Sequence, residues 1–295
     1  TRIRPMITND DITQLPKIRF SGFSDIREMP GAELIEALGD SYHHVGLDDT
    51  IVVTRSNKRA NIFNQGIRNM VLDREEELES GDMLMIVKNN YYWMEEERKK
   101  IKERQLSEER KVKSGKFNTL ANHTVQSNEV SSHEIPAFLA NGDRAKVMKV
   151  SRRIELYGFH FATLLLKFPD YDNYELEATV LLDTLTSEAS ALTHDQQEQL
   201  FHKIEEDYQD IPLKADRMKA IRQDPYFNAL QVKFAYAVTC HKAQGGQWSH
   251  VYVDQGYMTD DMLTPDYIHW LYTAFTRATE MLYLVNWPKT QVEGE

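Results

Sequence analysis

Cysteine is nearly absent from the sequence, since Cys240 is the single thiol in 295 residues. The chain therefore has no internal disulfide framework and no metal site built from cysteines. Long apolar runs are also missing, because none approaches the ~18 residues that a membrane helix needs. The first residues show no apolar core of a signal peptide. We expect a cytoplasmic, bacterial protein with no membrane partner.

Positive charge is in deficit. The sequence has 35 Lys and Arg against 46 Asp and Glu, which gives a formal net charge of −11. This balance argues against capture of nucleic acid by the charge of the whole domain. Much of the acid lies in residues 75–79, 95–97 and 195–210, so a local basic groove stays open as an interpretation.

A complete nucleotide-binding loop is missing as well. The nearest approach to G-x-x-x-x-G-K-[ST] is RKVKSGKF, in which Arg110 replaces the first Gly and Phe117 replaces Ser or Thr. The acidic run MVLDREEE resembles a metal-binding box only weakly, because it follows a predicted helix end. The histidines form no recognisable ligand set. We therefore expect no metal site and no binding of Mg·ATP by this chain alone.

The outer parts of the chain, 1–80 and 230–295, carry an α/β pattern. The apolar run Ile51–Val53 is typical of a parallel strand buried on both faces, and Ser56 or Asn57 can cap the helix that follows. Strands are predicted over 232–238, in HVYVD and in MLYLV, with a helix in DYIHWLYTAFTRATE that ends one turn after Arg277. The pattern predicts one parallel-sheet domain. The buried face of its helix after residue 56 should contain Ala60, Phe63, Ile67, Met70 and Val71.

The middle of the chain, 81–229, reads as an insertion. GDMLMIVKNNYYW predicts one strand, and the charged residues 95–133 predict a solvated helix or a mobile excursion. Three further β-rich runs, broken at Gly158 and at 169–173, predict a small antiparallel barrel. Two helices should follow within 193–223.

Polar side chains follow the predicted strands, where ligands collect in open α/β sheets. Arg55 follows the first strand, His241 follows the 232–238 strand, and Arg277 lies near a helix end. Two arginines suit a nucleotide phosphate, which guanidinium binds in a bidentate fork. Taken singly, each arginine is better explained by a surface ion pair, His241 by a satisfied or solvent-facing side chain, and Gly245–Gly246 by a tight turn.

Four segments resemble motifs of superfamily-one DNA helicases, and they occur in the matching order. IVVTRSNKRAN resembles motif IV, GDMLMIVKNNYYW resembles the start of the inserted domain of RecD-like enzymes, YAVTCHKAQGGQW resembles motif V, and LYTAFTRATEMLYLV resembles motif VI. The chain thus resembles the C-terminal half of such a helicase, in the RecD-like and UvrD-like group, over nearly its whole length.

The resemblance implies two RecA-like motor domains that clamp ATP and Mg²⁺, with this chain as the second domain and without its own P-loop. Arg277 would be the arginine finger and Arg55 a second phosphate contact. Gln244, Gly246 and Gln247 would also contact the nucleotide, although position 247 is usually Glu in UvrD-like enzymes. Contacts to single-stranded DNA would come from Asn57, Thr239, His241 and Lys242.

The insertion resembles a Src-homology-type barrel that helps to hold or split DNA in RecD-like helicases. Tyr91 and Tyr92 would then stack on bases, each for ~1–3 kcal/mol. The alternative is that these rings pack the barrel against the motor domain, which we favour for Trp93.

Two functions of different classes remain. The first is the C-terminal portion of a monomeric, ATP-dependent DNA helicase. This portion would be inactive without its N-terminal motor domain, and the helicase would act on single-stranded DNA or on a junction with a duplex. The alternative is a stand-alone, non-catalytic module that binds DNA or protein. A self-contained hydrolase or nuclease lacks the carboxylate or metal constellation it would need. The sequence does not indicate a pathway such as repair or recombination.

Overall fold

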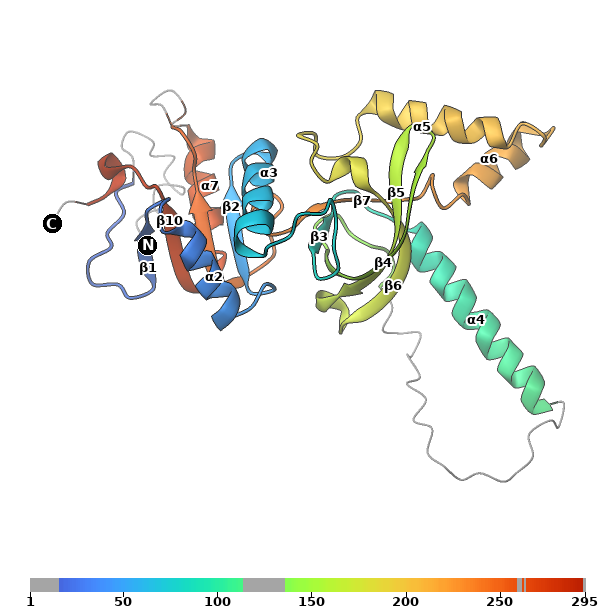
Figure 1. Cartoon of the computed structure of the whole chain (residues 1–295), viewed down its shortest axis with the longest axis horizontal. Coiled ribbons are helices and arrows are strands. Elements are labelled where there is room, and N and C mark those ends of the chain that lie inside the picture. The colour runs from blue at the N-terminus through green and yellow to red at the C-terminus, as the bar shows by residue number, and fades with distance from the viewer. Residues whose placement is uncertain (1–15, 114–135, 259–261, 263, 294–295) are drawn as a thin grey trace. The chain divides into compact units, whose positions relative to one another are not determined.

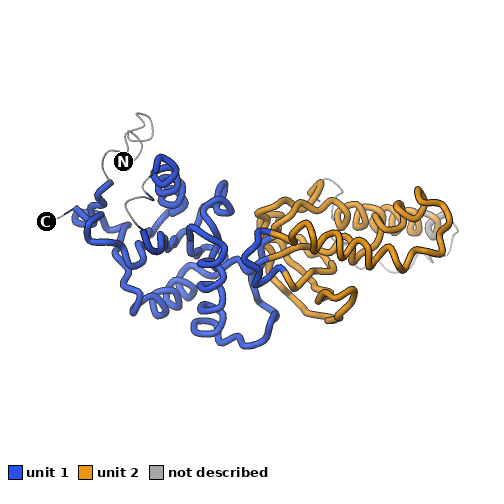
Figure 2. The backbone as a smooth tube through the Cα atoms, turned by 90° about the horizontal axis from the view of Figure 1, so that it is seen from above, with its two compact units in different colours: residues 1–85, 184–190, 233–295 blue, residues 86–183, 191–232 orange. Residues whose placement is uncertain are grey.

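The computed structural model describes residues 16–113, 136–258, 262 and 264–293, and it divides into two compact units. Unit 1 consists of Thr1–Met85, Thr184–Ser190 and Lys233–Glu295, and unit 2 of Ile86–Asp183 and Ala191–Val232 (Figure 2). The outer boundaries differ from the predicted ones at 80/81 and 229/230. In addition, the short segment 184–190 belongs to unit 1.

Unit 1 contains a five-stranded sheet in the order β1-β10-β9-β2-β8, and all four pairs are parallel. The parallel α/β prediction is confirmed. The helices of this unit are α2 (Leu34–His44), α3 (Asn57–Gly66) and α7 (Pro265–Phe275), as Figure 1 shows. The strands are β1 (Ile26–Met29), β2 (Thr50–Thr54), β8 (Ala237–Thr239), β9 (Trp248–Asp254) and β10 (Ala278–Val285).

Helix α3 begins where the sequence predicts it. The Ser56 hydroxyl accepts a hydrogen bond from the Arg59 N–H at 3.2 Å, which satisfies a donor that the first turn leaves open. The helix then widens into a π-turn over Ile67–Val71. A π-turn holds one residue more than an α-helical turn, and this extra residue rotates the side of the helix that packs against the core. Met70 is therefore 67% exposed, contrary to the prediction, and Arg68 is buried instead.

The predicted strand over 232–238 is wrong, because two strands occupy this run. β7 (Leu230–Phe234) joins the barrel, and β8 joins the parallel sheet. The side chain of Asn64 fixes the break between them. Its amide nitrogen donates to the carbonyls of Phe234 and Ala237, and its oxygen accepts from the Ala237 N–H at 2.7 Å.

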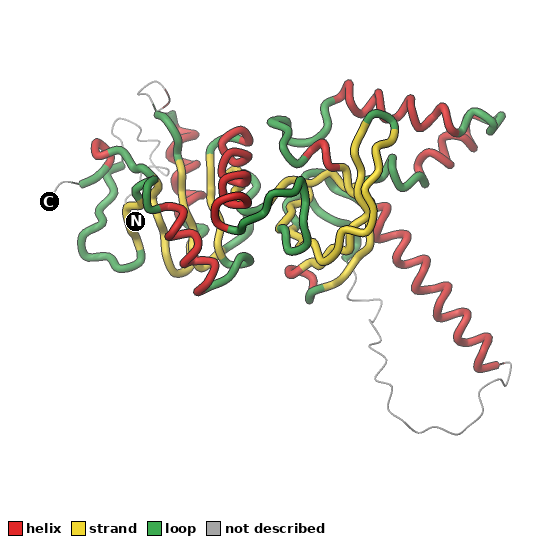
Figure 3. Tube along the Cα trace, viewed as in Figure 1, coloured by secondary structure: helices red, strands yellow, loops and turns green. Residues whose placement is uncertain are grey.

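A closed barrel is formed by β3-β4-β5-β6-β7 (Figure 3). The predicted barrel is confirmed, but not as fully antiparallel, since β6 and β7 pair in parallel. Helices α5 (His194–Asp207) and α6 (Lys214–Arg222) contribute to an apolar core with β5. The remaining strands are β3 (Met83–Ile86), β4 (Arg144–Leu156), β5 (Phe159–Phe168) and β6 (Tyr174–Leu181). Short 3₁₀ turns cover Pro169–Tyr171, Leu182–Thr184 and Lys289–Gln291.

The strand predicted from GDMLMIVKNNYYW is too long. β3 ends at Ile86, and helix α4 (Tyr92–Lys113) begins within the aromatic run. The charged residues 95–113 lie in this helix, and 102–108 are exposed, while 114–133 lie outside the described residues. Across the described part of the chain, no helix is long and apolar enough to cross a membrane.

Candidate functional site

The two predicted phosphate-binding arginines lie at opposite ends of the sheet. Arg55 follows Thr54, which pairs with Asp254 at the carboxyl end of β9, and Arg277 precedes Ala278, which pairs with Trp248 at its amino end. At ~3.3 Å per strand residue, the six steps of β9 from Trp248 to Asp254 place the strand ends next to the two arginines about 20 Å apart. The two side chains lie closer than these strand ends, because Arg277 Nε bonds Thr273 O and Thr273 lines the same cavity as Arg55. The expectation that both lie at the carboxyl ends is wrong, since helix α7 ends at Phe275 and β10 starts directly after Arg277.

Arg55 lies at a cavity of about 410 Å³ beside α7, which we call the α7 pocket. Its guanidinium carbon is 5.8 Å from the ring centre of Tyr267 and 5.9 Å from that of Trp270, and its Nη1 contacts Met258 Sδ. No ion pair of Arg55 is present in the described ranges. The surface ion-pair alternative therefore does not explain it. The pocket is lined by Arg55, Cys240, His241, Gln244, Asp266 and His269, among others.

Arg277 is half-buried and is held by neutral acceptors alone. Its Nε donates to Thr273 O at 2.9 Å, its Nη1 to Gly246 O at 2.9 Å, and its Nη2 to Thr276 Oγ1 at 3.0 Å. Within the residues that the structure describes, no carboxylate pairs with it. A fixed guanidinium without a counter-ion is suited to an anionic ligand.

The loop 240–247 connects these two ends of the sheet. It leaves β8 after Thr239 at the carboxyl end and reaches β9 at Trp248 beside Arg277. His241, Gln244 and Gln247 are exposed along it. The structure thus brings Arg55, His241 and Gln244 together in the α7 pocket, while Gly246 and Gln247 lie beside Arg277.

Burial shapes the chemistry of this loop. Desolvation lowers the pKa of the half-buried Lys242 ammonium and raises the pKa of the Cys240 thiol to about 11, an increase that the positive charge of Arg277 partly offsets. The buried thiol is therefore not a nucleophile at neutral pH. A Cβ added at Gly246 would lie 2.3 Å from the Trp248 ring, so glycine is required at this position.

Sequence reasoning missed an ion pair next to the α7 pocket. Arg59 binds Asp254 in a bidentate pair, with Nε–Oδ2 at 2.6 Å and Nη2–Oδ1 at 3.0 Å. The hydrogen bond to this carboxylate raises the pKa of Arg59 further. The sequence feature that could have drawn attention to Arg59 was its spacing, because it lies one helical turn after Arg55. Asn57, a predicted DNA contact, is half-buried in the same first turn of α3.

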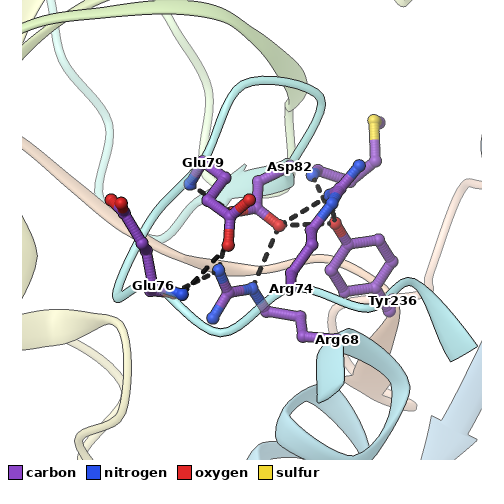
Figure 4. Close-up of polar contacts among 7 residues, drawn as sticks. Arg68, Arg74, Glu76, Glu79, Asp82 and Tyr236 are labelled. Atoms are coloured by element: carbon purple, nitrogen blue, oxygen red, sulfur yellow. Dashed lines mark hydrogen bonds and ion pairs between the residues drawn. The ribbon is translucent and has the colours of Figure 1, made fainter. Parts of the chain in front are cut away.

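A second missed cluster surrounds Asp82, a fully buried carboxylate at the start of β3 (Figure 4). Its two oxygens accept from Arg68 Nε and Nη2 at 3.0 Å, Arg74 Nη1 at 2.7 Å, the Glu79 N–H at 2.7 Å and the Tyr236 hydroxyl at 2.8 Å. Tyr236 also accepts from the Met83 N–H. We refer to Arg68, Arg74, Asp82 and Tyr236 as the Asp82 cluster. The acidic run read as a weak metal box thus contributes Arg74 to an ion-pair network.

The two tyrosines predicted to stack on bases differ in their surroundings. Tyr91 is 55% exposed and stacks on Phe138 at 4.8 Å, whereas the Tyr92 hydroxyl donates to Gln223 O at 3.0 Å. Trp93 is buried and its indole N–H donates to Asn228 O at 2.9 Å, within unit 2. In the described part of the chain, no group of three His, Cys, Asp or Glu side chains could hold a metal ion.

Comparison with known proteins bears on the C-terminal part of the chain. Residues 234–285 match the family described as the UvrD-like helicase C-terminal domain. The match covers the loop 240–247, α7 and Arg277, and it confirms the predicted resemblance to a superfamily-one helicase; it does not distinguish the RecD-like subgroup. Among solved structures, the Pif1 helicase from Candida albicans is similar at 13% identity and a TM-score of 0.28, and the whole of this chain spans 55% of that one. No curated protein matches the chain.

Proposed function

We propose that this chain, with its helicase-derived segment 234–285, is the second, RecA-like motor domain of an ATP-dependent DNA helicase or translocase, interrupted by a barrel-containing insertion. The observation that carries the proposal is Arg277, whose guanidinium is fixed by three neutral acceptors inside the matched segment. The P-loop that binds ATP and Mg²⁺ would lie in the preceding motor domain of the same protein.

Arg277, Gly246 and Gln247 form the proposed nucleotide side. The charge of Arg277 would stabilise the negative charge that develops on the transferred γ-phosphoryl group, and the exposed Gln247 side chain could hydrogen-bond the nucleotide. Loss of an arginine finger lowers the hydrolysis rate by roughly 10³–10⁵.

The α7 pocket forms the proposed DNA side. Because Arg55 lines the α7 pocket together with His241, a predicted DNA contact, we assign Arg55 to a phosphate of the DNA strand and not to the nucleotide. Its guanidinium lies beside the Tyr267 and Trp270 rings, and its N–H groups at the pocket suit an anion. Further DNA contacts would come from Asn57, Thr239, His241, Lys242 and Gln244.

The loop 240–247 supports coupling between the two sides. Gly246 O accepts from Arg277, and five residues earlier His241 lines the α7 pocket. A shift of Arg277 on nucleotide binding would move Gly246 and thereby the DNA-contacting end of the loop. Closing and opening of the nucleotide cleft would in this way advance the protein along the strand.

The test is DNA-stimulated ATP hydrolysis by the protein that includes the preceding motor domain. We expect Arg277→Ala to lower kcat by at least 10³-fold with DNA binding retained, and this chain alone to hydrolyse no ATP. Arg27→Ala, on the exposed edge strand β1, is the matched control and should keep wild-type turnover. Wild-type kcat in Arg277→Ala would refute the assignment. DNA binding without any DNA-stimulated ATPase in the wild type would favour the non-catalytic alternative.

A further inference from the structure

A cavity of about 250 Å³ lies wholly within unit 2 and takes no part in the motor chemistry described above. Its walls come from residues 88–92, from the first turns of α5 and from residues 227–231. We call it the unit 2 cavity. Sites for whole drug-sized ligands measure ~300–1,000 Å³. The unit 2 cavity is therefore suited to one small planar group.

Two aromatic rings border the unit 2 cavity and remain accessible. Tyr91 is 55% exposed and Phe227 is 37% exposed, although both carry large apolar surfaces. Each contacts a further ring: Tyr91 stacks on Phe138 at 4.8 Å, and Phe227 makes an edge contact with Phe201 at 6.2 Å. Exposed rings are suited to stacking on another flat ring.

Most polar groups of the cavity are held by hydrogen bonds, and two of its amides keep N–H₂ donors available. Gln231 is only 9% exposed, and its side-chain oxygen accepts from the Leu192 N–H at 3.0 Å, so its amide N–H₂ is the remaining group. The Asn89 oxygen accepts from the Asn141 N–H at 2.7 Å, which leaves its amide N–H₂ as well. Lys88 adds an exposed ammonium, of which one N–H is used by Gln197 at 3.2 Å.

Taken together, the cavity offers ring faces, hydrogen-bond donors and a positive charge. The ligand complementary to all three has a flat aromatic ring, an edge of acceptors and an attached negative charge. We propose that the unit 2 cavity binds one unpaired nucleobase of a single-stranded nucleic acid, with Lys88 at the adjacent phosphate. Because Gln231 and Asn89 present donors, it should prefer keto bases, thymine and guanine, over cytosine and adenine. The choice of DNA rests on the proposed function; the base site itself does not.

The test compares fluorescently labelled oligo-dT with an oligomer of the same length built from abasic sites, by anisotropy, with this chain and no ATP. Both ligands carry the same phosphates, so the difference in Kd reports the bases. We expect Tyr91→Leu and Phe227→Leu each to weaken oligo-dT binding by about 5- to 150-fold, the factor that corresponds to one stacked base. Binding to the abasic oligomer should stay unchanged, and Tyr91→Phe should behave as wild type.

The controls separate this inference from the motor assignment. Arg55→Ala should weaken both oligomers by the same factor, since it concerns a phosphate. Oligo-dC should bind more weakly than oligo-dT to the wild type, and Gln231→Leu should remove this preference. Equal affinity of the wild type for oligo-dT and the abasic oligomer would overturn the base site, whatever the ATPase result. A loss of ATPase in Arg277→Ala, in turn, does not bear on it.

Discussion

The Asp82 cluster should be a major source of stability in unit 1, and Asp82→Asn is the change that tests it. The carboxylate is fully buried and accepts five hydrogen bonds, three from arginine nitrogens, one from the Glu79 N–H and one from the Tyr236 hydroxyl. Arg68, one of its partners, is itself only 2% exposed. The substitution keeps the shape of the side chain but removes its charge and turns one acceptor into a donor.

The magnitude follows from these contacts. Whichever way the amide is oriented, at least two of the five bonds would join donor to donor, and a hydrogen bond to a charged group is worth ~1.5–3 kcal/mol. The sum, roughly 3–6 kcal/mol, agrees with the ~3–5 kcal/mol observed when one partner of a buried ion pair is removed. Arg68 keeps its bond to Glu76 O and its place 4.4 Å from the Phe234 ring centre, so we expect the lower half of this range.

Urea unfolding followed by tryptophan fluorescence measures the effect, since Trp248, Trp270 and Trp287 lie in unit 1. With a slope of ~2 kcal/mol per molar urea, a loss of ~3–4 kcal/mol lowers the midpoint by roughly 2 M. Asp170→Asn is the matched control, because its ion pair with Arg144 is at 3.4 Å and its side chain is 52% exposed. An exposed pair contributes ~0–1 kcal/mol. Midpoints that fall equally in both variants would refute the reasoning.

Two further predictions concern Lys233 and the glycines. Burial lowers the pKa of the Lys233 ammonium to about 8, against ~10.4 in an unfolded chain. Between these two pH values the unfolded state binds one more proton than the folded state, so the free energy of unfolding should rise with pH. Relative to Lys233→Met, the expected rise is about 2 kcal/mol from pH 7.5 to 9.5. Parallel pH profiles of the two proteins would contradict this. Gly246→Ala should displace the Trp248 ring and lower DNA-stimulated ATPase, whereas Gly66→Ala, in α3 with open space around it, should retain ATPase and stabilise by ~0.5–1 kcal/mol in thermal melts.

Local signals in the sequence predicted the elements of unit 1 well. Ser56 caps α3, and the apolar run 51–53 lies in a buried parallel strand, because both features depend on near neighbours alone. The split between β7 and β8 could not be read in this way. The mainly apolar run from 230 to 239 indicates burial, but it does not indicate which of two sheets buries each part. The break depends on Asn64, more than 160 residues away.

The layout of the candidate site could not be predicted from the sequence. The motif segments identified Arg55, His241 and Arg277, whereas the separation of the two arginines depends on strand register, which spacing does not encode. Periodicity placed Met70 inside because a regular helix was assumed, and the π-turn buried Arg68 instead. The Asp82 cluster was not predicted, because its partner Tyr236 lies in a distant part of the chain.

The segment 184–190 limits how the protein can be dissected. It is separated from the rest of unit 1 in sequence, yet Lys233 donates to Thr184 O and Ser187 O, and Asn61 donates to Thr186 O and Ser187 O. Excising the barrel as one continuous block, 86–232, would remove these acceptors and leave the Lys233 ammonium without its two hydrogen bonds. A minimal fragment of unit 1 instead needs two short linkers, one from Met85 to Thr184 and one from Ser190 to Lys233, so that this heptapeptide stays in place and keeps its hydrogen bonds.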